Sequence, residues 1–519
     1  MDVLVVLAVV IPILGSAATL VLPYKRWSAL LCSGASFGVL CRLMIEPLPL
    51  EFIIELPMNP LHIGIFIDGF SLIFAVLLSF LFFLAIVYSS YIEARRYYSL
   101  LLLDLGLLLL IVFSQELLIF YVFLEMSTIV TYFLVIHNET EEAVKAGFKY
   151  LIMNVGGAIL ILLAILLKGS FLGALLFIAG CLVKAGSFPV HVWLADAHPA
   201  APSAVSALLS GALVKVGIYS LFRFAPHFGA DLSWLIPVAL ASMVVGVFLA
   251  LVQSDVKRIL AYSTVSQLGI VLLGIVLQSE ESVSGGMLHF VNHGLFKALL
   301  FLCMGCVIYA TGERNIHHLG GLHSKMPVTA TACLVGCLSI SGIPPFNGFV
   351  SKSILFHALE SPVMKAAFVI TCAGTVASFT KLFRHTFLGA PGTKVKGVPR
   401  SMRLPLIVLS GLCIFLGFFP GIVLSLTGCT VECDVWSSSA VPEVLLTAGL
   451  GVFFYFVGLK TKVILKTPTF SIVDRFFCGF GKLIEYLSGL LDRWLTQDVN
   501  YYTAYMILFL VFLFFLLSL

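Results

Sequence analysis

Residues 182–224 read LVKAGSFPVHVWLADAHPAAPSAVSALLSGALVKVGIYSLFRF. This stretch holds two apolar runs with one lysine in each, Lys184 and Lys215, and a proline-rich segment between them that begins at Pro189. Proline removes a backbone donor and clashes with the preceding turn, so a helix that runs through this segment must break. Non-helical backbone at membrane depth persists only where it is buried in protein or lines a wet cavity. The stretch therefore predicts a broken membrane helix flanked by buried lysines.

The composition extends this prediction to the whole chain. Of 519 residues, 60% are hydrophobic and 11% are charged, whereas soluble domains carry roughly 25% charged residues. Apolar runs of about 18–25 residues recur, each long enough to cross about 30 Å of hydrocarbon. We expect an all-α polytopic membrane protein with about 14–16 transmembrane helices, in a prokaryotic plasma membrane. The expected crossings are 3–22, 28–45, 67–90, 98–113, 116–136, 146–167, 171–188, 203–224, 233–253, 258–278, 285–310, 326–358, 364–387, 404–426, 442–459 and 500–518.

A second proline-containing break lies in SGIPPFNGFVSK (341–352), at Pro344 and Pro345. The apolar run 326–358 is too long for one straight helix, so it must contain this break. Two interrupted segments at matching places in two halves indicate inverted repeats, as in secondary transporters. We expect four parts: N-terminal helices over 1–97, a first inverted repeat over 98–225, a second inverted repeat over 233–388, and C-terminal helices over 404–519.

Basic residues in the short loops predict the orientation, because cytoplasmic loops carry an excess of Lys and Arg. The basic loops alternate with acidic or neutral ones, which places both termini outside. The N-terminal run follows Asp2 and lacks a basic start, so we expect a first membrane helix and no cleaved signal. The net charge of +4 is spread over loops and does not indicate a nucleic-acid partner.

The C-terminal stretch 471–495 has apolar residues at three- and four-residue steps, so it predicts an amphipathic helix. It would lie on the cytoplasmic membrane surface or act as a strut against a neighbouring subunit. Cys429 and Cys433 stand in a polar loop, where a disulfide forms only if that loop faces an oxidising exterior. Most other cysteines lie in apolar runs and are expected to be small buried hydrophobes.

Ionisable residues in the middle of apolar runs are the candidate site. Each costs about 2.5–3.5 kcal/mol on insertion scales, so each indicates function by default, with a structural ion pair or a packing role as the alternative. Lys381, at a predicted cytoplasmic end, is expected to be an anchor. Lys257, near such an end beside Arg258, is open between anchor and function. The candidate proton-pathway residues are Glu125, Lys184, Lys215, Lys257, His289, His293 and Lys352.

His289 and His293 lie four residues apart, which places them and the following Lys297 on one helical face. A zinc-hydrolase motif requires Glu directly after the first His, and here that residue is Phe290. A proton relay suits the near-neutral titration of histidine. No metal site, cofactor or catalytic centre is predicted.

A mechanism follows from these groups. Burial favours a neutral amine, and a carboxylate nearby favours the ammonium. Glu125 and Lys184 would form one switchable pair, from which Lys215, the two histidines and Lys257 would lead to Lys352 as the exit.

At these residues the chain resembles the antiporter-like subunits of Mrp antiporters, respiratory complex I and related membrane-bound hydrogenases. The resemblance spans roughly 60–420 and is carried by residues 182–224, DVKRILAYSTVSQLG (255–269), HFVNHGLFKALLFL (289–302) and SGIPPFNGFVSK. It implies that all seven candidate residues match the family's proton-conducting positions, Lys257 included, and a core of about fourteen crossings. Residues 182–224 look closest to the D-type subunit of Mrp antiporters and to its counterpart in the hydrogenases.

The expected function is therefore proton translocation, alone or in exchange for sodium, as one component of a multisubunit complex whose partners are other membrane subunits and lipid. The complex would be redox-driven or an antiporter. Two alternatives stay open from the sequence: a stand-alone transporter of an organic solute, which needs a polar and aromatic pocket at the midplane, and a scaffold whose ion pairs only hold helices together.

Overall fold

The computed structural model describes residues 2–55, 62–389, 395–426 and 440–460. They fall within one compact unit, Met1–Thr467, and the second unit, Pro468–Leu519, lies outside the described residues. The amphipathic segment 471–495, the expected crossing 500–518, Cys429 and Cys433 therefore also lie outside them. The helices are α1 (Asp2–Val21), α2 (Lys25–Leu43), α3 (Gly69–Tyr88), α4 (Arg95–Phe113), α5 (Leu117–Val135), α6 (Glu141–Leu166), α7 (Phe171–Ala185), α8 (Val192–Ala200), α9 (Ser203–Leu208), α10 (Lys215–Phe224), α11 (Ile236–Val252), α12 (Val256–Val276), α13 (Glu280–Thr311), α14 (Pro327–Ser341), α15 (Asn347–Ala358), α16 (Pro362–Phe387), α17 (Arg400–Phe418), α18 (Gly421–Leu426) and α19 (Ala440–Lys460).

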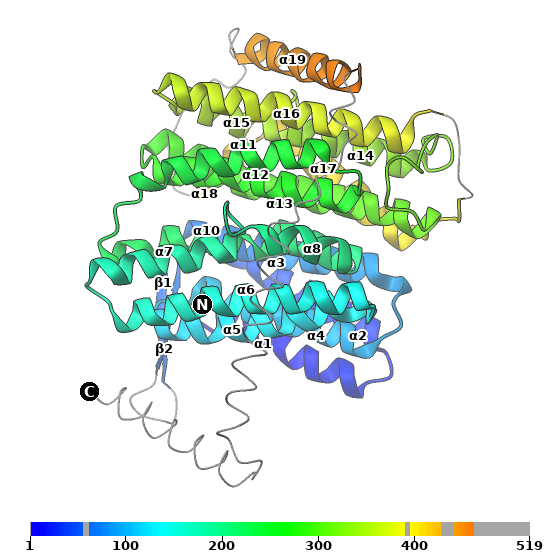
Figure 1. The fold of residues 1–519 in the computed structure, drawn as a ribbon. Coiled ribbons are helices and arrows are strands. Elements are labelled where there is room, and N and C mark those ends of the chain that lie inside the picture. The colour runs from blue at the N-terminus through cyan, green and yellow to red at the C-terminus, as the bar shows by residue number, and fades with distance from the viewer. Residues whose placement is uncertain (1, 56–61, 390–394, 427–439, 461–519) are drawn as a thin grey trace, which may run out of the picture. The chain divides into compact units, whose positions relative to one another are not determined.

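The helices confirm a polytopic membrane protein. Twelve spans among the described residues are long and apolar enough to cross a membrane, and α7 and α14 are shorter apolar helices. α2 is not among the twelve, although it packs between α1 and α3. Figure 1 places the cyan helices α5–α8 together on one side of the unit and the green to yellow helices α11–α16 on the other. α13 of the second group also contacts α3.

Both expected helix breaks are present. α7 ends at Ala185 and α8 begins at Val192, and α14 ends at Ser341 and α15 begins at Asn347. The first half of each broken helix is followed by a glycine in the left-handed region, Gly186 (φ 61°) and Gly342 (φ 75°). The residue after each glycine donates its backbone N–H back five residues, to Leu182 or to Leu338. This is one type of C-terminal cap used twice, and cis prolyl bonds follow at Phe188–Pro189 and Pro344–Pro345.

Three local features were not predicted from the sequence. β1 (Leu50–Glu55) and β2 (His62–Ile67) form an antiparallel hairpin in which Leu50 pairs with Ile67, so the described residues are not purely helical. The expected crossing 404–426 is divided into α17 and α18 at Pro420. The crossing 203–224 contains a π-helical turn, η3 (Leu209–Leu213), between α9 and α10. Such turns often mark functional sites inside helices.

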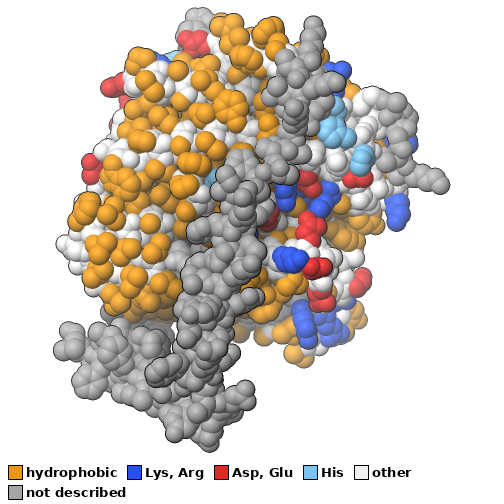
Figure 2. All heavy atoms as spheres, viewed as in Figure 1, with side chains coloured by type: hydrophobic (Ala, Val, Ile, Leu, Met, Phe, Trp, Pro, Cys, Tyr) orange, Lys and Arg blue, Asp and Glu red, His pale blue; other side chains and the backbone are white. Residues whose placement is uncertain are grey.

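Charged side chains gather at one end of the helices, whereas hydrophobic side chains cover most of the visible flank (Figure 2). Asp196 at this end pairs with Lys149 at 2.6 Å and with Arg258 at 3.1 Å. Arg314 pairs with Glu142 and Asp255. Lys149, Arg258 and Arg314 come from three basic regions that we expect at the cytoplasmic side, and their ion pairs place them on one face. In the same loop region, the backbone N–H of Asn315 donates to Glu313 and holds the pKa of that carboxyl below its ordinary value.

The crossing of α10 over α7 depends on Gly217, and this gives a first prediction. A Cβ at Gly217 would meet backbone atoms of Cys181 and Ala185, including the Ala185 Cα at 2.9 Å. Backbone cannot rotate away, so Gly217→Ala is expected to destabilise the protein by about 1–3 kcal/mol. The measurement is the thermal unfolding midpoint of the purified protein. Gly156→Ala on α6 is the matched control, because a Cβ there meets nothing within 4 Å. Equal midpoints for the two variants would contradict the tight crossing.

Candidate functional site

The first candidate pair joins α5 to the end of α7. Lys184 Nζ lies 3.8 Å from Glu125 Oε1, and the lysine side chain is 7% exposed. The same amine donates to Thr128 Oγ1 at 2.5 Å. Glu125 is 21% exposed, and its buried Oε1 has no hydrogen-bond partner. Lys184 therefore stands in the last turn of α7, beside the helix break, between a carboxylate and a hydroxyl.

A cavity extends from this pair toward the middle of the unit. Its polar lining includes Ser127, Thr128, Tyr150, Asn154 and Lys184. Its far wall is apolar and includes Leu209 at the start of the π-helical turn. A space with several polar groups at one end can hold water next to the Lys184 amine.

Lys215 follows the π-helical turn and is fully buried. Its Nζ donates to His293 Nδ1 of α13 at 2.8 Å and to the Ser210 carbonyl at 3.2 Å. In the π-helical turn, Val214 N–H donates to the Leu209 carbonyl, five residues back. The amine of Lys215 also lies 5.6 Å from the centre of the Phe290 ring. The turn thus sets the lysine against the histidine helix.

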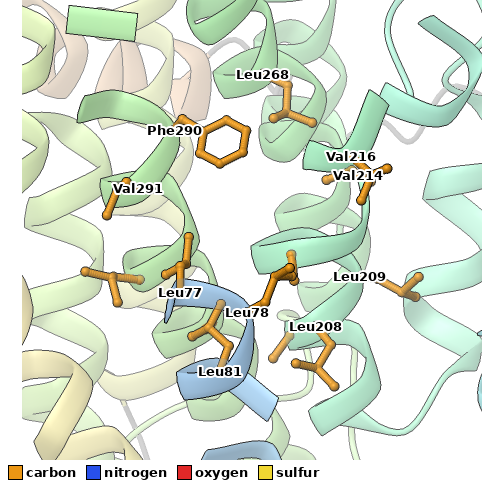
Figure 3. Close-up of a cluster of buried hydrophobic side chains, with 14 of the residues drawn as sticks. Leu77, Leu78, Leu81, Leu208, Leu209, Val214, Val216, Leu268, Phe290 and Val291 are labelled. Carbon is orange, nitrogen blue, oxygen red and sulfur yellow. The ribbon is translucent and has the colours of Figure 1, made fainter. Parts of the chain in front are cut away.

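Figure 3 shows a cluster of buried hydrophobic side chains that includes Val214 and Val216, the two residues next to Lys215 in the chain. Leu77, Leu78 and Leu81 of α3 belong to the same buried cluster as Leu208 and Leu209. Tightly packed leucines leave little room for water. The polar contacts of Lys215 with His293 and Ser210 therefore offer a proton a route through this apolar cluster.

His289 continues the polar line from His293 toward the second break. The two imidazole rings are 6.5 Å apart. His289 Nδ1 lies 2.9 Å from Ser351 Oγ, and His289 Nε2 lies 3.2 Å from Gln267 Oε1. Because the Gln267 oxygen can only accept, the imidazole hydrogen belongs on Nε2. Ser351 directly precedes Lys352 on α15, so the line reaches the second broken helix.

Lys352 lies after the second break and is 4% exposed. Its amine donates to the Ile340 carbonyl of α14 at 2.6 Å. A cavity beside it is lined by Lys352, His357 of α15 and Glu443 of α19. The cavity also touches Ser341 and Gly342, so it extends from the second helix break along α15.

Lys257 stands at the other end of the unit. Its amine donates to the Ala201 carbonyl at 2.7 Å and to Ser206 Oγ at 3.3 Å. It lines a cavity together with His137 and Arg314, and Arg314 belongs to the charged face described above. Lys257 is therefore a buried amine at the bottom of an inlet on that face, not an exposed anchor.

The structure thus brings the seven predicted residues into three groups. Glu125 contacts Lys184; Lys215 contacts His293, with His289 and Lys352 following; and Lys257 lies apart near the charged face. Among the buried lysines that the structure describes, only Lys184 has a carboxylate oxygen within 4 Å. Removing one partner of a buried ion pair costs several kcal/mol. The amines of Lys215, Lys257 and Lys352 have no carboxylate of the described residues within 4 Å and donate to neutral acceptors instead.

Several buried ionisable groups, including His191, were not among the predicted pathway residues. Asp104 of α4 is fully buried, and so is His198, which stacks on Phe301 with ring centres 4.6 Å apart. Lys297 donates to Ser263 Oγ at 2.6 Å and not toward Lys215. Lys381, expected to be an anchor, is buried and donates to the carbonyls of Leu251 and Gln253 at the end of α11.

The sequence held a signal for Asp104, Lys297 and His198. Asp104 and Lys297 interrupt apolar runs, and His198 lies in the quoted break. The anchor expectation for Lys381 was wrong because α11 ends beside α16 and leaves carbonyls that need a donor.

Cys333 and Cys337 are neighbours on α14, with their sulfurs 3.9 Å apart. Nowhere in the described ranges do three His, Cys, Asp or Glu side chains gather as metal ligands would.

Comparison with known proteins agrees with this arrangement. A family model described as "NADH:quinone oxidoreductase/Mrp antiporter, TM" matches residues 114–173 and 167–380. Hydrogenase-4 component B of Escherichia coli is 34% identical over 352 residues, which cover 57% of this chain and 52% of that protein. The A-type subunit of the Na(+)/H(+) antiporter of Alkalihalophilus pseudofirmus is 32% identical over 433 residues, which cover 71% and 54%.

A solved structure of the Mrp complex from a Dietzia species has a chain of the same fold. The match has a TM-score of 0.81 at 23% identity and covers 98% of this chain and 62% of that chain. The chain spans about half the length of the curated relatives it matches.

Proposed function

Because this chain belongs to the NADH:quinone oxidoreductase/Mrp antiporter transmembrane family, we propose that it is the proton-translocating subunit of a multisubunit membrane complex. The observation that carries this proposal is the buried Lys184–Glu125 pair, which the same helical unit holds together with two further groups of buried amines and imidazoles. An ionisable group inside a membrane is expensive unless it has a task. Here several such groups lie in sequence, each within reach of polar neighbours.

The pathway begins at either of two places. Lys257 at the bottom of the inlet on the charged face is one entry. The cavity that Lys184 lines is the other, and Glu125 contacts it through Lys184. Lys184 would release its proton when Glu125 moves or is neutralised, because the carboxylate is what favours its charged form.

The second half of the pathway runs through the centre. Lys215 passes a proton to His293 along their 2.8 Å contact. His289 and Ser351 then lead to Lys352. The cavity that holds His357 and Glu443 is the exit to the opposite face. A charge that crosses 100 mV gains or loses about 2.3 kcal/mol, so small changes at each group are enough for coupling.

Two kinds of complex fit this role. Similarity to a component of a protein named as a Na(+)/H(+) antiporter supports exchange of protons for sodium. Similarity to a hydrogenase component supports coupling to a redox module. Mass spectrometry of the proteins that co-purify with the chain separates these two cases, because a hydrogenase-like module would accompany only the second.

Replacing Glu125 by glutamine tests the proposed function. Glutamine keeps the shape but removes the titratable carboxyl, so we expect proton flux into vesicles that contain the assembled complex to fall at least about tenfold, equivalent to about 1.4 kcal/mol. Glu141→Gln is the matched control, since Glu141 is exposed and pairs only with the exposed Lys145. Sodium flux is measured in parallel. Normal flux in an assembled Glu125→Gln complex would refute the proposed function.

A further inference from the structure

Asp104 is the most deeply buried carboxyl group outside the pathway described above. It lies in the middle of α4 and has no exposed surface. One oxygen, Oδ1, accepts from Ser127 Oγ at 2.6 Å, and the other, Oδ2, accepts from Thr131 Oγ1 at 3.1 Å. Both hydroxyls belong to α5, so the carboxyl is bound entirely by the helix that carries Glu125.

No cation stands beside this carboxyl in the described part of the chain. Lys and Arg approach other acids within 4 Å, but none approaches Asp104. α3 carries no Asp, Glu, Lys, Arg or His, and those of α1 and α2 stand at the helix ends. The ionisable group that interacts with the site is Tyr150 of α6, which interacts with both Asp104 and Glu125. A buried charge without a partner is among the costliest features that a membrane protein can hold.

The face of α5 links Asp104 to Lys184. Ser127 and Thr128 are consecutive residues, and both line the cavity that also contains Lys184. Ser127 donates to Asp104, whereas Thr128 accepts from the lysine amine at 2.5 Å. The acid of α4 and the amine of α7 are therefore separated by two adjacent hydroxyls and one shared cavity.

We propose that Asp104 is a further proton-binding residue of the first half of the chain, which loads from the Lys184 cavity through Ser127. A proton that arrives from the cavity binds Ser127 Oγ, while the hydrogen already in the 2.6 Å contact moves onto Asp104 Oδ1. One proton enters, the carboxylate becomes a carboxylic acid, and no electrons move. The reverse step returns the proton to the cavity and to Lys184.

A purely structural role of Asp104 would not require a side chain that can bind and release a proton. If the contact only tied α4 to α5, an asparagine would serve as well, because its amide oxygen can accept from one hydroxyl and its amide nitrogen can donate to the other. The inference rests on the proposed function, because the stored proton matters only if Lys184 and Glu125 carry protons.

The experiment compares Asp104→Asn with the wild-type complex in vesicles. Asparagine keeps an acceptor for Ser127, so we expect normal assembly, a several-fold loss of proton flux and a changed pH profile of transport. Difference infrared spectra of the wild type are expected to contain a protonated-carboxyl band that is missing from Asp104→Asn. Asp231→Asn is the matched control, since Asp231 is exposed and bonds only to Ser233.

The outcomes separate the two proposals. Loss of flux in Glu125→Gln with normal flux, pH profile and spectrum in Asp104→Asn overturns this inference and leaves the proposed function standing. Normal flux in Glu125→Gln overturns the proposed function and, with it, the storage role of Asp104. If Asp104→Asn fails to assemble, Ser127→Ala replaces it: an unchanged pH profile in that variant overturns the inference, and a changed one supports it.

Discussion

Replacing Lys184 by alanine is expected to abolish proton flux while the complex still assembles. Lys184 is the only buried lysine among the described residues whose amine has a carboxylate oxygen within 4 Å. The same amine also donates to Thr128. Its removal takes the proton carrier out of the cavity and leaves Glu125 without its cation. We expect a fall of at least about tenfold, since a change of about 1.4 kcal/mol already has that effect.

Lys184→Arg separates a proton carrier from a structural ion pair. Arginine keeps the positive charge but does not release its proton in proteins. If the pair only stabilises the contact of α5 with α7, arginine will restore flux. If Lys184 must release a proton, Lys184→Arg will be as inactive as Lys184→Ala. Lys145→Ala, which breaks a pair exposed on both sides, is the control and should leave flux unchanged.

The second large effect is expected at the contact of Lys215 with His293. Lys215→Met fills a similar volume without an amine, and His293→Phe replaces the imidazole with an apolar ring. Each change removes one partner of the 2.8 Å contact in the middle of a dry leucine cluster. We expect each variant to lose most of its proton flux, by at least about tenfold.

The double variant shows whether the two residues act together. Groups in direct contact are coupled, so the double variant should be no less active than either single variant. Multiplying losses would mean that Lys215 and His293 act in separate steps, which would contradict the central link. Thermal unfolding of the same preparations checks that the loss of flux is not a loss of folded protein.

Much of the fold could be read from the sequence because membrane insertion is decided locally. Runs of about 20 apolar residues cross the bilayer wherever they occur, and proline breaks a helix wherever it occurs. The breaks at Pro189 and at Pro344 and Pro345 were therefore expected and are present. The division into inverted repeats and the roles of the seven pathway residues remain predictions.

The hairpin of β1 and β2 was not predicted because it depends on contacts between segments and not on the composition of one segment. Its stability depends on pairing between Leu50 and Ile67, and on docking where Gln115 N–H donates to the Gly64 carbonyl. Neither contact produces a pattern of apolar and polar residues within a strand. The apolar runs of the neighbouring membrane helices are the stronger pattern in this part of the sequence. The π-helical turn before Lys215 likewise depends on one backbone bond, from Val214 to Leu209.

By itself the sequence determined that this chain lies in a membrane, that helices break at Pro189 and at Pro344 and Pro345, and that the seven predicted residues lie within or next to apolar runs. Only the tertiary structure decided which of those side chains meet: Lys215 with His293, His289 with Ser351, and Asp104 with the hydroxyls of α5. Insertion depends on the hydrophobicity of one segment at a time, whereas a hydrogen bond requires two atoms about 3 Å apart. That distance is set by how helices far apart in the chain pack, so no single segment contains it.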